Sequence, residues 1–152
     1  MNEELRLARA SDAPAIRELT RIAYAKWVPL IGREPKPMGA DYEKAVCAHR
    51  FDLLYRDGNL AALIETIPQH DHLLIENLAV LPSYQGLGLG RKLVAHVETL
   101  AASEGFAEVR LYTNQLFSEN VAFYSRLGYR AYREEEFRGG IAVHMSKPTA
   151  QT

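Results

Sequence analysis

Residues 78–92 read Leu78-Ala79-Val80-Leu81-Pro82-Ser83-Tyr84-Gln85-Gly86-Leu87-Gly88-Leu89-Gly90-Arg91-Lys92, and the rest of the chain is organised around them. The stretch predicts an apolar strand, a break at the proline, a loop with glycine at every second position, and an amphipathic helix. Glycines leave backbone N–H groups open to a ligand and tolerate positive φ. At the positive end of a helix, beside two basic residues, such groups favour an anion, most naturally phosphate or pyrophosphate. The predicted apolar helix face comprises Leu93, Val94, Val97, Leu100 and Ala101.

Counting excludes two common phosphate loops. A Walker loop and a dinucleotide fingerprint that began at Gly86 would both require glycine where Arg91 stands. The remaining pattern, Gln85-x-x-Gly88-x-Gly90, resembles the [QR]-x-x-G-x-[GA] loop that binds the pyrophosphate of acyl-CoA in the GNAT (GCN5-related N-acetyltransferase) superfamily. The alternative is a tight strand-to-helix connection without a ligand.

A second motif lies about thirty residues further on. The segment Asn120-Val121-Ala122-Phe123-Tyr124-Ser125-Arg126-Leu127-Gly128-Tyr129 resembles the GNAT signature N-x-x-A-x-x-[FY]-Y-x-x-x-G-[FY], although Asn120 lies only two residues before Ala122. Two motifs in this order are more specific than either alone. The resemblance covers essentially the whole chain and implies an α/β fold with a central mixed, mostly antiparallel sheet flanked by helices.

Length and composition indicate one domain. The chain has 152 residues, 47% of them hydrophobic and 24% charged, which suits a core without disulfides or metal. We expect a domain over residues 1–148 and a frayed tail over 149–152. A net charge of −1 gives no basic field for nucleic acid. A single cysteine, an acidic start and no long apolar run lead us to expect a cytoplasmic protein without membrane contact.

Periodicity and turn residues place the other elements. Helices are expected from Ser11 or Asp12, from Asp41 to about 50, from the glycine loop to Gly105, and from a Ser118 cap to 128. The first helix should bury Ala15, Ile16, Leu19, Ile22 and Ala23. Strands are expected over 5–8, 51–55, 60–67, 72–80, 108–112, 129–137 and 141–146, with hairpin turns at 57–58 and 138–140.

Tyr124 is the first candidate catalytic residue. As a helix aromatic it could simply pack in the core. The resemblance implies instead that its phenol donates a proton to the departing thiolate of coenzyme A. Asn120, at the start of the same helix, would hydrogen-bond the pantetheine arm, or else satisfy a backbone N–H.

Glu76 is the candidate general base for the attacking amine. A glutamate in an apolar strand is costly unless it is paired or functional, and carboxylates near this position act as bases in several GNAT enzymes. The alternative is a hydrogen-bonded or solvent-facing side chain. If strands 72–80 and 108–113 splay apart, the edge near Leu78 and Val80 could pair with the pantetheine amides, and a backbone N–H there could hold the oxyanion. The predicted site for acetyl-CoA therefore comprises Leu78, Val80, Gln85, Gly86, Gly88, Gly90, Arg91 and Asn120.

In the family, the acceptor site is built by the first two helices, their loop and the final hairpin. Here these segments supply Tyr24, Trp27, Ile31, Met38 and Tyr42, which either pack in the core or form a wall over the acceptor. The expected acceptor is a small-molecule or peptide amine, and a homodimer through the last strands is an open option. Two hypotheses follow: an enzyme that acetylates a primary amine by direct attack in a ternary complex, or a noncatalytic acyl-CoA-binding regulatory module.

Three further features receive structural interpretations. His70 and His72 flank a turn, and without further ligands we expect no metal. Cys47 lies on an apolar helical pattern and is expected to be buried. The acidic run 134–136 is expected to face solvent, with attraction of a cationic acceptor as the alternative.

Overall fold

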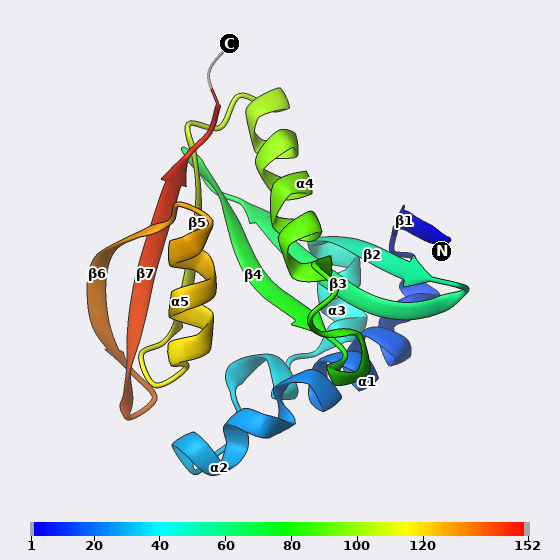
Figure 1. Cartoon of the computed structure of the whole chain (residues 1–152), viewed down its shortest axis with the longest axis horizontal. Coiled ribbons are helices and arrows are strands. Elements are labelled where there is room, and N and C mark those ends of the chain that lie inside the picture. Colours follow the sequence, from blue (N-terminus) through cyan, green and yellow to red (C-terminus); the bar gives the residue numbers. More distant parts are fainter. Residues whose placement is uncertain (1, 151–152) are drawn as a thin grey trace.

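Seven strands form a single sheet, which the computed structural model describes within residues 2–150 (Figure 1). The order across the sheet is β1-β2-β3-β4-β5-β7-β6. Only β4 and β5 run parallel, and the other neighbours are antiparallel, so the mixed, mostly antiparallel sheet is confirmed. The strands are β1 (Glu3–Leu7), β2 (Arg50–Arg56), β3 (Asn59–Pro68), β4 (His72–Val80), β5 (Glu108–Asn114), β6 (Arg130–Phe137) and β7 (Gly140–Pro148).

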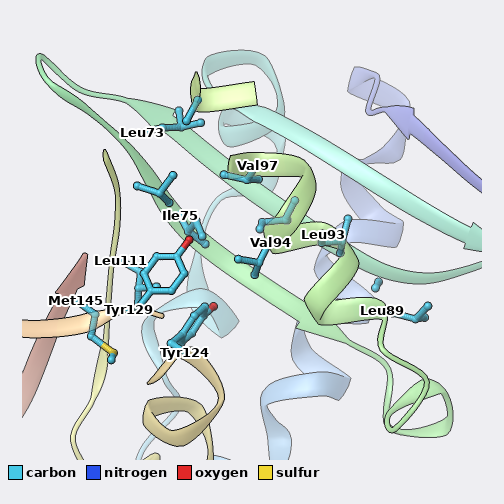
Figure 2. Close-up of a cluster of buried hydrophobic side chains, with 14 of the residues drawn as sticks. Leu73, Ile75, Leu89, Leu93, Val94, Val97, Leu111, Tyr124, Tyr129 and Met145 are labelled. Atoms are coloured by element: carbon cyan, nitrogen blue, oxygen red, sulfur yellow. The ribbon is translucent and has the colours of Figure 1, made fainter. Parts of the chain in front are cut away.

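Helices cover both faces of the sheet. One buried cluster joins α4 (Leu89–Ser103) and α5 (Ser118–Arg126) to one face, and the other joins α1 (Ala13–Tyr24) and α3 (Tyr42–Ala48) to the opposite face (Figures 1 and 2). The remaining short elements are α2 (Val28–Ile31) and the 3₁₀ turns Ala10–Asp12, Ala25–Trp27, Lys36–Gly39 and Pro82–Tyr84. Within residues 2–150 we find no helix with the length and apolar character to cross a bilayer.

Several local predictions hold. The buried face of α4 contains four of the five predicted residues, and Leu100 packs beside it half-buried. Asp41 caps α3, because its side chain accepts a hydrogen bond from the Lys44 N–H. Both predicted hairpin turns carry a pair of residues with positive φ, Asp57-Gly58 and Arg138-Gly139, as two-residue hairpins require. The acidic run in β6 is exposed.

Other local predictions are wrong. In α1, Ala15 and Ile22 are exposed, and Thr20 takes an inward position because its hydroxyl accepts a hydrogen bond from a buried asparagine of β4. Cys47 is exposed, because α3 buries Tyr42 on its other side. Ser118 is not the cap of α5. The helix begins after Phe117, and no side chain caps it.

The C-terminal segment also differs in part from expectation. The predicted frayed tail begins at Thr149, but that residue is buried, and its hydroxyl donates to the Phe106 carbonyl. Residues 151–152 lie outside the described part of the chain.

A bulge in β4 shapes the centre of the sheet. Thr66 lies opposite Ile75 and Glu65 lies opposite Asn77, which leaves Glu76 as an extra residue between the two pairs. The alternation of β4 therefore reverses at this point. Leu73 and Ile75 face α4 before the bulge, and Leu78 and Val80 do so after it.

The same point marks the end of the pairing between β4 and β5. These strands pair only over residues 72–75 and 108–111. Beyond them β4 continues along β3, and β5 continues along β7, so the two strands diverge (Figure 1). The sheet thus supplies the splay on which the predicted cofactor site depends.

Replacing Leu93 by alanine tests the core on the α4 face. Leu93 is 1% exposed, so we expect Leu93→Ala to lower the free energy of unfolding by about 2–5 kcal/mol. Leu116, which is 52% exposed, is the control, and Leu116→Ala should change it by less than about 0.5 kcal/mol. Urea unfolding measures both. Equal losses would contradict the assignment of Leu93 to the core.

Candidate active site

Two hollows meet where β4 and β5 part. The loop groove is lined by the end of β4, the glycine loop, the start of α4 and one side of α5. The interstrand pocket lies between β4 and β5 and is lined also by the 31–37 loop and the β6–β7 hairpin. Four residues line both hollows: Tyr24, Leu78, Asn120 and Phe123. A molecule extending along the loop groove would therefore reach the interstrand pocket at these side chains.

The loop groove contains all of the predicted cofactor residues. Gly86 and Gly88 have φ of +79°, and a Cβ at either would meet nothing within 4 Å, so their backbone faces open space. The position of Gly90 is more closely packed, because a Cβ there would lie 3.4 Å from the Phe123 ring, at the near limit of ordinary van der Waals contact. The residues brought together are Leu78, Val80, Gln85, Gly86, Gly88, Gly90, Arg91 and Asn120.

The start of α4 forms the anion-binding end of this groove. The helix follows directly from Gly88, and its first intrahelical bond at this end runs from the Lys92 N–H to the Gly88 carbonyl. The N–H groups of the first turn consequently have no carbonyl partner within the helix, and they lie at its positive end. Arg91 lines the groove beside them. This arrangement suits a phosphate or diphosphate group.

The open edge of β4 forms the other end of the groove. The Tyr24 hydroxyl lies 3.2 Å from the Leu78 carbonyl oxygen, and the Gln85 side-chain amide lies 3.5 Å from that of Val80. These carbonyls point away from β3, so the backbone of alternate residues is open to an added strand-like partner. The positions are those predicted from the sequence.

Tyr124 packs in the core, as the first interpretation expects, and it also borders the interstrand pocket. Its side chain is 6% exposed, and its ring packs edge-on against Phe123 and Tyr129 at centroid distances of 5.0 and 5.6 Å (Figure 2). Burial raises the pKa of the Tyr124 phenol, so the group is protonated at neutral pH. The residue is therefore a core aromatic with a protonated phenol, and it lines the pocket.

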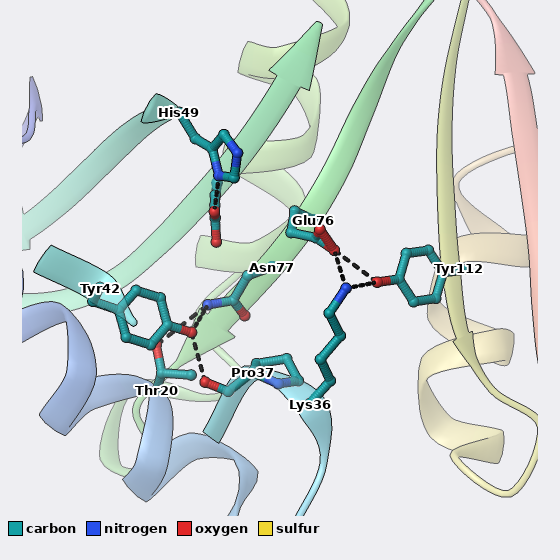
Figure 3. Close-up of polar contacts among 9 residues, drawn as sticks. Thr20, Lys36, Pro37, Tyr42, His49, Glu76, Asn77 and Tyr112 are labelled. Atoms are coloured by element: carbon teal, nitrogen blue, oxygen red, sulfur yellow. Dashed lines mark hydrogen bonds and ion pairs between the residues drawn. The ribbon is translucent and has the colours of Figure 1, made fainter. Parts of the chain in front are cut away.

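Glu76 projects from the bulge into the interstrand pocket, where two partners meet it (Figure 3). The Tyr112 hydroxyl donates a hydrogen bond of 2.7 Å to Glu76 Oε1, and Lys36 Nζ lies 3.6 Å from the same oxygen. Lys36 Nζ also donates to the Tyr112 hydroxyl at 2.9 Å. Burial alone would lower the pKa of Lys36, but the hydrogen bond to Tyr112 and the charge of Glu76 outweigh it and raise that pKa.

Asn77 fixes the bulge from the opposite face of the sheet (Figure 3). Its amide nitrogen lies 3.3 Å from both the Thr20 hydroxyl and the Tyr42 hydroxyl, and its Oδ1 accepts a 2.8 Å bond from the Tyr24 hydroxyl. The Tyr42 hydroxyl in turn donates to the Pro37 carbonyl at 2.7 Å. This buried network ties α1, α3 and the loop to the strand that presents Glu76. Lys36, Tyr112 and Asn77 are not among the site residues predicted from the sequence.

The predicted acceptor residues fall into two groups. Tyr24 and Ile31 line the interstrand pocket, and Trp27 lines the loop groove, where it stacks on Phe117 at 4.4 Å. Tyr42 is fully buried and Met38 is 6% exposed, and neither lines either hollow. Tyr42 lines a third hollow, which Lys36 and Glu76 also line, and Met38 lines none of these three.

Comparison with known proteins identifies the family. The chain matches the model of the acetyltransferase (GNAT) family over residues 15–129. The chain belongs to this family. Streptothricin acetyltransferase of Streptomyces lavendulae is 26% identical over 134 residues, which cover 79% of this chain and 71% of that protein.

Solved GNAT structures share the fold over nearly the entire chain. The ribosomal-protein-S18-alanine N-acetyltransferase of Escherichia coli superposes with a TM-score of 0.79 at 22% identity, covering 99% of this chain and 96% of the other. The PaiA N-acetyltransferase of Thermoplasma acidophilum, in complex with coenzyme A, gives 0.77 at 18% identity, covering 97% and 99%. These likenesses confirm the GNAT fold expected from the two sequence motifs.

Adding a single methyl group in the glycine loop tests the anion site. Gly88→Ala places a Cβ on the backbone that faces the groove, and we expect it to weaken binding of coenzyme A on the order of tenfold or more. Gly105, with φ of +83° at the far end of α4, is the matched control. Gly105→Ala incurs a similar backbone strain, about 1–2 kcal/mol, without approaching the groove. Titration calorimetry measures the affinity. Unchanged affinity in Gly88→Ala would refute this position for the diphosphate.

Proposed function

We propose that this protein is an N-acetyltransferase that transfers the acetyl group of acetyl-CoA to a primary amine of a small molecule or peptide. The observation that carries the proposal is the junction of the loop groove with the interstrand pocket. On one side of it lie the glycine loop and the open edge of β4, and on the other lies the Glu76 carboxylate. Donor and acceptor would thus meet in one ternary complex and react by direct attack.

Donor binding follows from the groove. The N–H groups at the start of α4 and the Arg91 side chain would hold the diphosphate of acetyl-CoA. The edge of β4 at Leu78 and Val80 would pair with the pantetheine amides as an added strand, and Asn120 would contact the same arm. The complex of the PaiA relative with coenzyme A supports this choice of donor.

The reaction then requires three proton movements. Glu76 accepts a proton from the acceptor ammonium, so that the neutral nitrogen attacks the thioester carbonyl carbon. A backbone N–H at the edge of β4 stabilises the oxyanion, and Tyr124 supplies a proton to the departing thiolate. The nitrogen loses a second proton as the amide forms, so that carbon–nitrogen and sulfur–hydrogen bonds replace the carbon–sulfur bond and one nitrogen–hydrogen bond of the neutral amine.

The acceptor class is supported from two directions. The interstrand pocket combines aromatic and aliphatic walls with one carboxylate, Glu76, and with the cations Arg33 and Lys36, so an amine with an apolar body would take the place of Lys36 beside Glu76. The names of two relatives refer to a small molecule, streptothricin, and to a protein alanine. Both classes are therefore retained in the proposal.

Substitution of Tyr124 tests the acid. We expect Tyr124→Phe to lower kcat about ten- to a thousandfold while the Kd for coenzyme A is nearly unchanged, because only the proton donor is lost. The assay measures free-thiol release from acetyl-CoA across a panel of amines. Tyr129→Phe is the control, since this neighbouring hydroxyl binds Glu98 and borders neither hollow. Equal rates for wild type and Tyr124→Phe would remove the role of Tyr124.

Substitution of Glu76 tests the base. We expect Glu76→Gln to lower kcat/KM about a hundred- to ten-thousandfold and to change the shape of the pH–rate profile, because the amide cannot accept the proton. Glu108→Gln, on β5 and paired with Arg110, is the control and should keep the wild-type profile. An unaltered profile in Glu76→Gln would exclude this base. Coenzyme A binding without thiol release from any amine would instead support the noncatalytic module.

A further inference from the structure

Lys36 places a primary amine of the chain itself inside the interstrand pocket (Figure 3). The residue belongs to the 3₁₀ turn Lys36–Gly39, and its side chain crosses to the opposite wall between β4 and β5. Nζ reaches Glu76 Oε1 at 3.6 Å and the Tyr112 hydroxyl at 2.9 Å. The amine therefore contacts the carboxylate that the proposed reaction uses as its base.

The position of this amine matches the requirements for an acetyl acceptor. An acceptor must bring an ammonium group to Glu76, lose a proton there and reach the thioester at the junction of the two hollows. Lys36 already meets the first requirement. The pocket that it lines continues to the junction, because Leu78 and Asn120 line both hollows.

Two contacts hold the side chain in the pocket, the 2.9 Å hydrogen bond to the Tyr112 hydroxyl and the ion pair with Glu76. The side chain is 44% exposed, and its contact with Glu76 is an ion pair of 3.6 Å rather than a close bidentate contact. Partly exposed pairs of this kind are weak, so they do not lock a long flexible side chain in one rotamer. To accept the acetyl group, Lys36 would leave both contacts and move toward the junction.

We propose that Lys36 is an intramolecular acetyl acceptor, so that the protein acetylates its own loop when acetyl-CoA is bound and no amine substrate is present. This inference rests on the proposed function, because it uses the same donor and base. The Lys36 ammonium gives one proton to Glu76, and the neutral Nζ attacks the thioester carbonyl carbon. The carbon–sulfur bond breaks, Nζ loses its second proton as the amide forms, and the thiolate leaves as coenzyme A after taking up one of the two protons that Lys36 has lost.

The modification would change the pocket that contains it. Acetylation removes the positive charge of Lys36, so the ion pair with Glu76 is lost. The added acetyl group also occupies space between β4 and β5. The modified protein should consequently turn over external amines more slowly than the unmodified protein. Acetylation of Lys36 would thus lower the activity of the enzyme.

Mass spectrometry of the full chain tests the inference. The protein is incubated with acetyl-CoA alone and digested with trypsin, which yields a peptide over residues 34–44 with Lys36 inside it. Lys92 is the internal control, because it is 57% exposed and is also paired with a carboxylate, that of Glu3. Nonenzymatic acetylation would favour Lys92 over Lys36, because the Lys92 side chain is the more exposed of the two. We expect Lys36 to be acetylated about tenfold faster or more, because its amine is held near the thioester.

Variants and dilution define the mechanism. Lys36→Arg keeps a cation beside Glu76 but has no amine, so peptide acetylation at this position should disappear, whereas Lys44→Arg should leave acetylation of Lys36 unchanged. Glu76→Gln should slow acetylation of Lys36 without affecting Lys92. Tenfold dilution of the protein should not change the fraction of Lys36 modified per unit time, because the reaction is intramolecular.

The outcomes separate this inference from the proposed function. If thiol release with added amines proceeds while Lys36 is modified no faster than Lys92, the inference is overturned and the proposed function stands. A rate that falls in proportion to dilution would overturn the intramolecular step. If neither added amines nor Lys36 become acetylated, the proposed function itself fails.

Discussion

The parting of β4 from β5 after Ile75 and Leu111 is the constraint on which the rest of the structure depends. Two parallel strands that separate inside a sheet leave backbone groups unpaired, which is tolerated only where a partner replaces the lost hydrogen bonds. Here the Gln85 side-chain amide reaches the Val80 carbonyl at 3.5 Å, the Tyr24 hydroxyl donates its proton to Asn77 and lies 3.2 Å from the Leu78 carbonyl, and α5 lies beside the gap. The edge of β4 therefore remains open to a ligand that can donate hydrogen bonds.

The bulge at Glu76 makes neighbouring side chains of β4 point to different surroundings beside this gap. Because the alternation of β4 reverses there, Asn77 turns toward α1 and α3, while Glu76 enters the pocket between the strands. The buried amide of Asn77 is saturated by three hydroxyl groups, and such saturated networks hold a backbone in one arrangement. The position of the carboxylate is therefore set by packing on the far face of the sheet.

Short patterns in the sequence were sufficient to predict most of the helices and strands and the residues that line the loop groove. The glycine loop, the Asn120–Tyr129 motif and the Asp57-Gly58 and Arg138-Gly139 turns each encode their geometry within a few residues. The contacts inside the interstrand pocket depend on residues far apart along the chain. Lys36, Glu76 and Tyr112 meet only because the sheet brings three separate segments together, and no spacing pattern reports such a contact. The inward position of Thr20 has the same origin, since its partner Asn77 belongs to β4.

The outer strand β6 has a consequence for assembly. It forms one edge of the sheet, and its side chains from Arg130 to Glu136 are all exposed and mostly charged. Charged side chains on an edge strand discourage the addition of another strand, because their hydration would be lost on docking. Continuous sheets formed edge to edge across two molecules are thereby disfavoured at this margin. Growth into fibrils from β6 is opposed by the same charges.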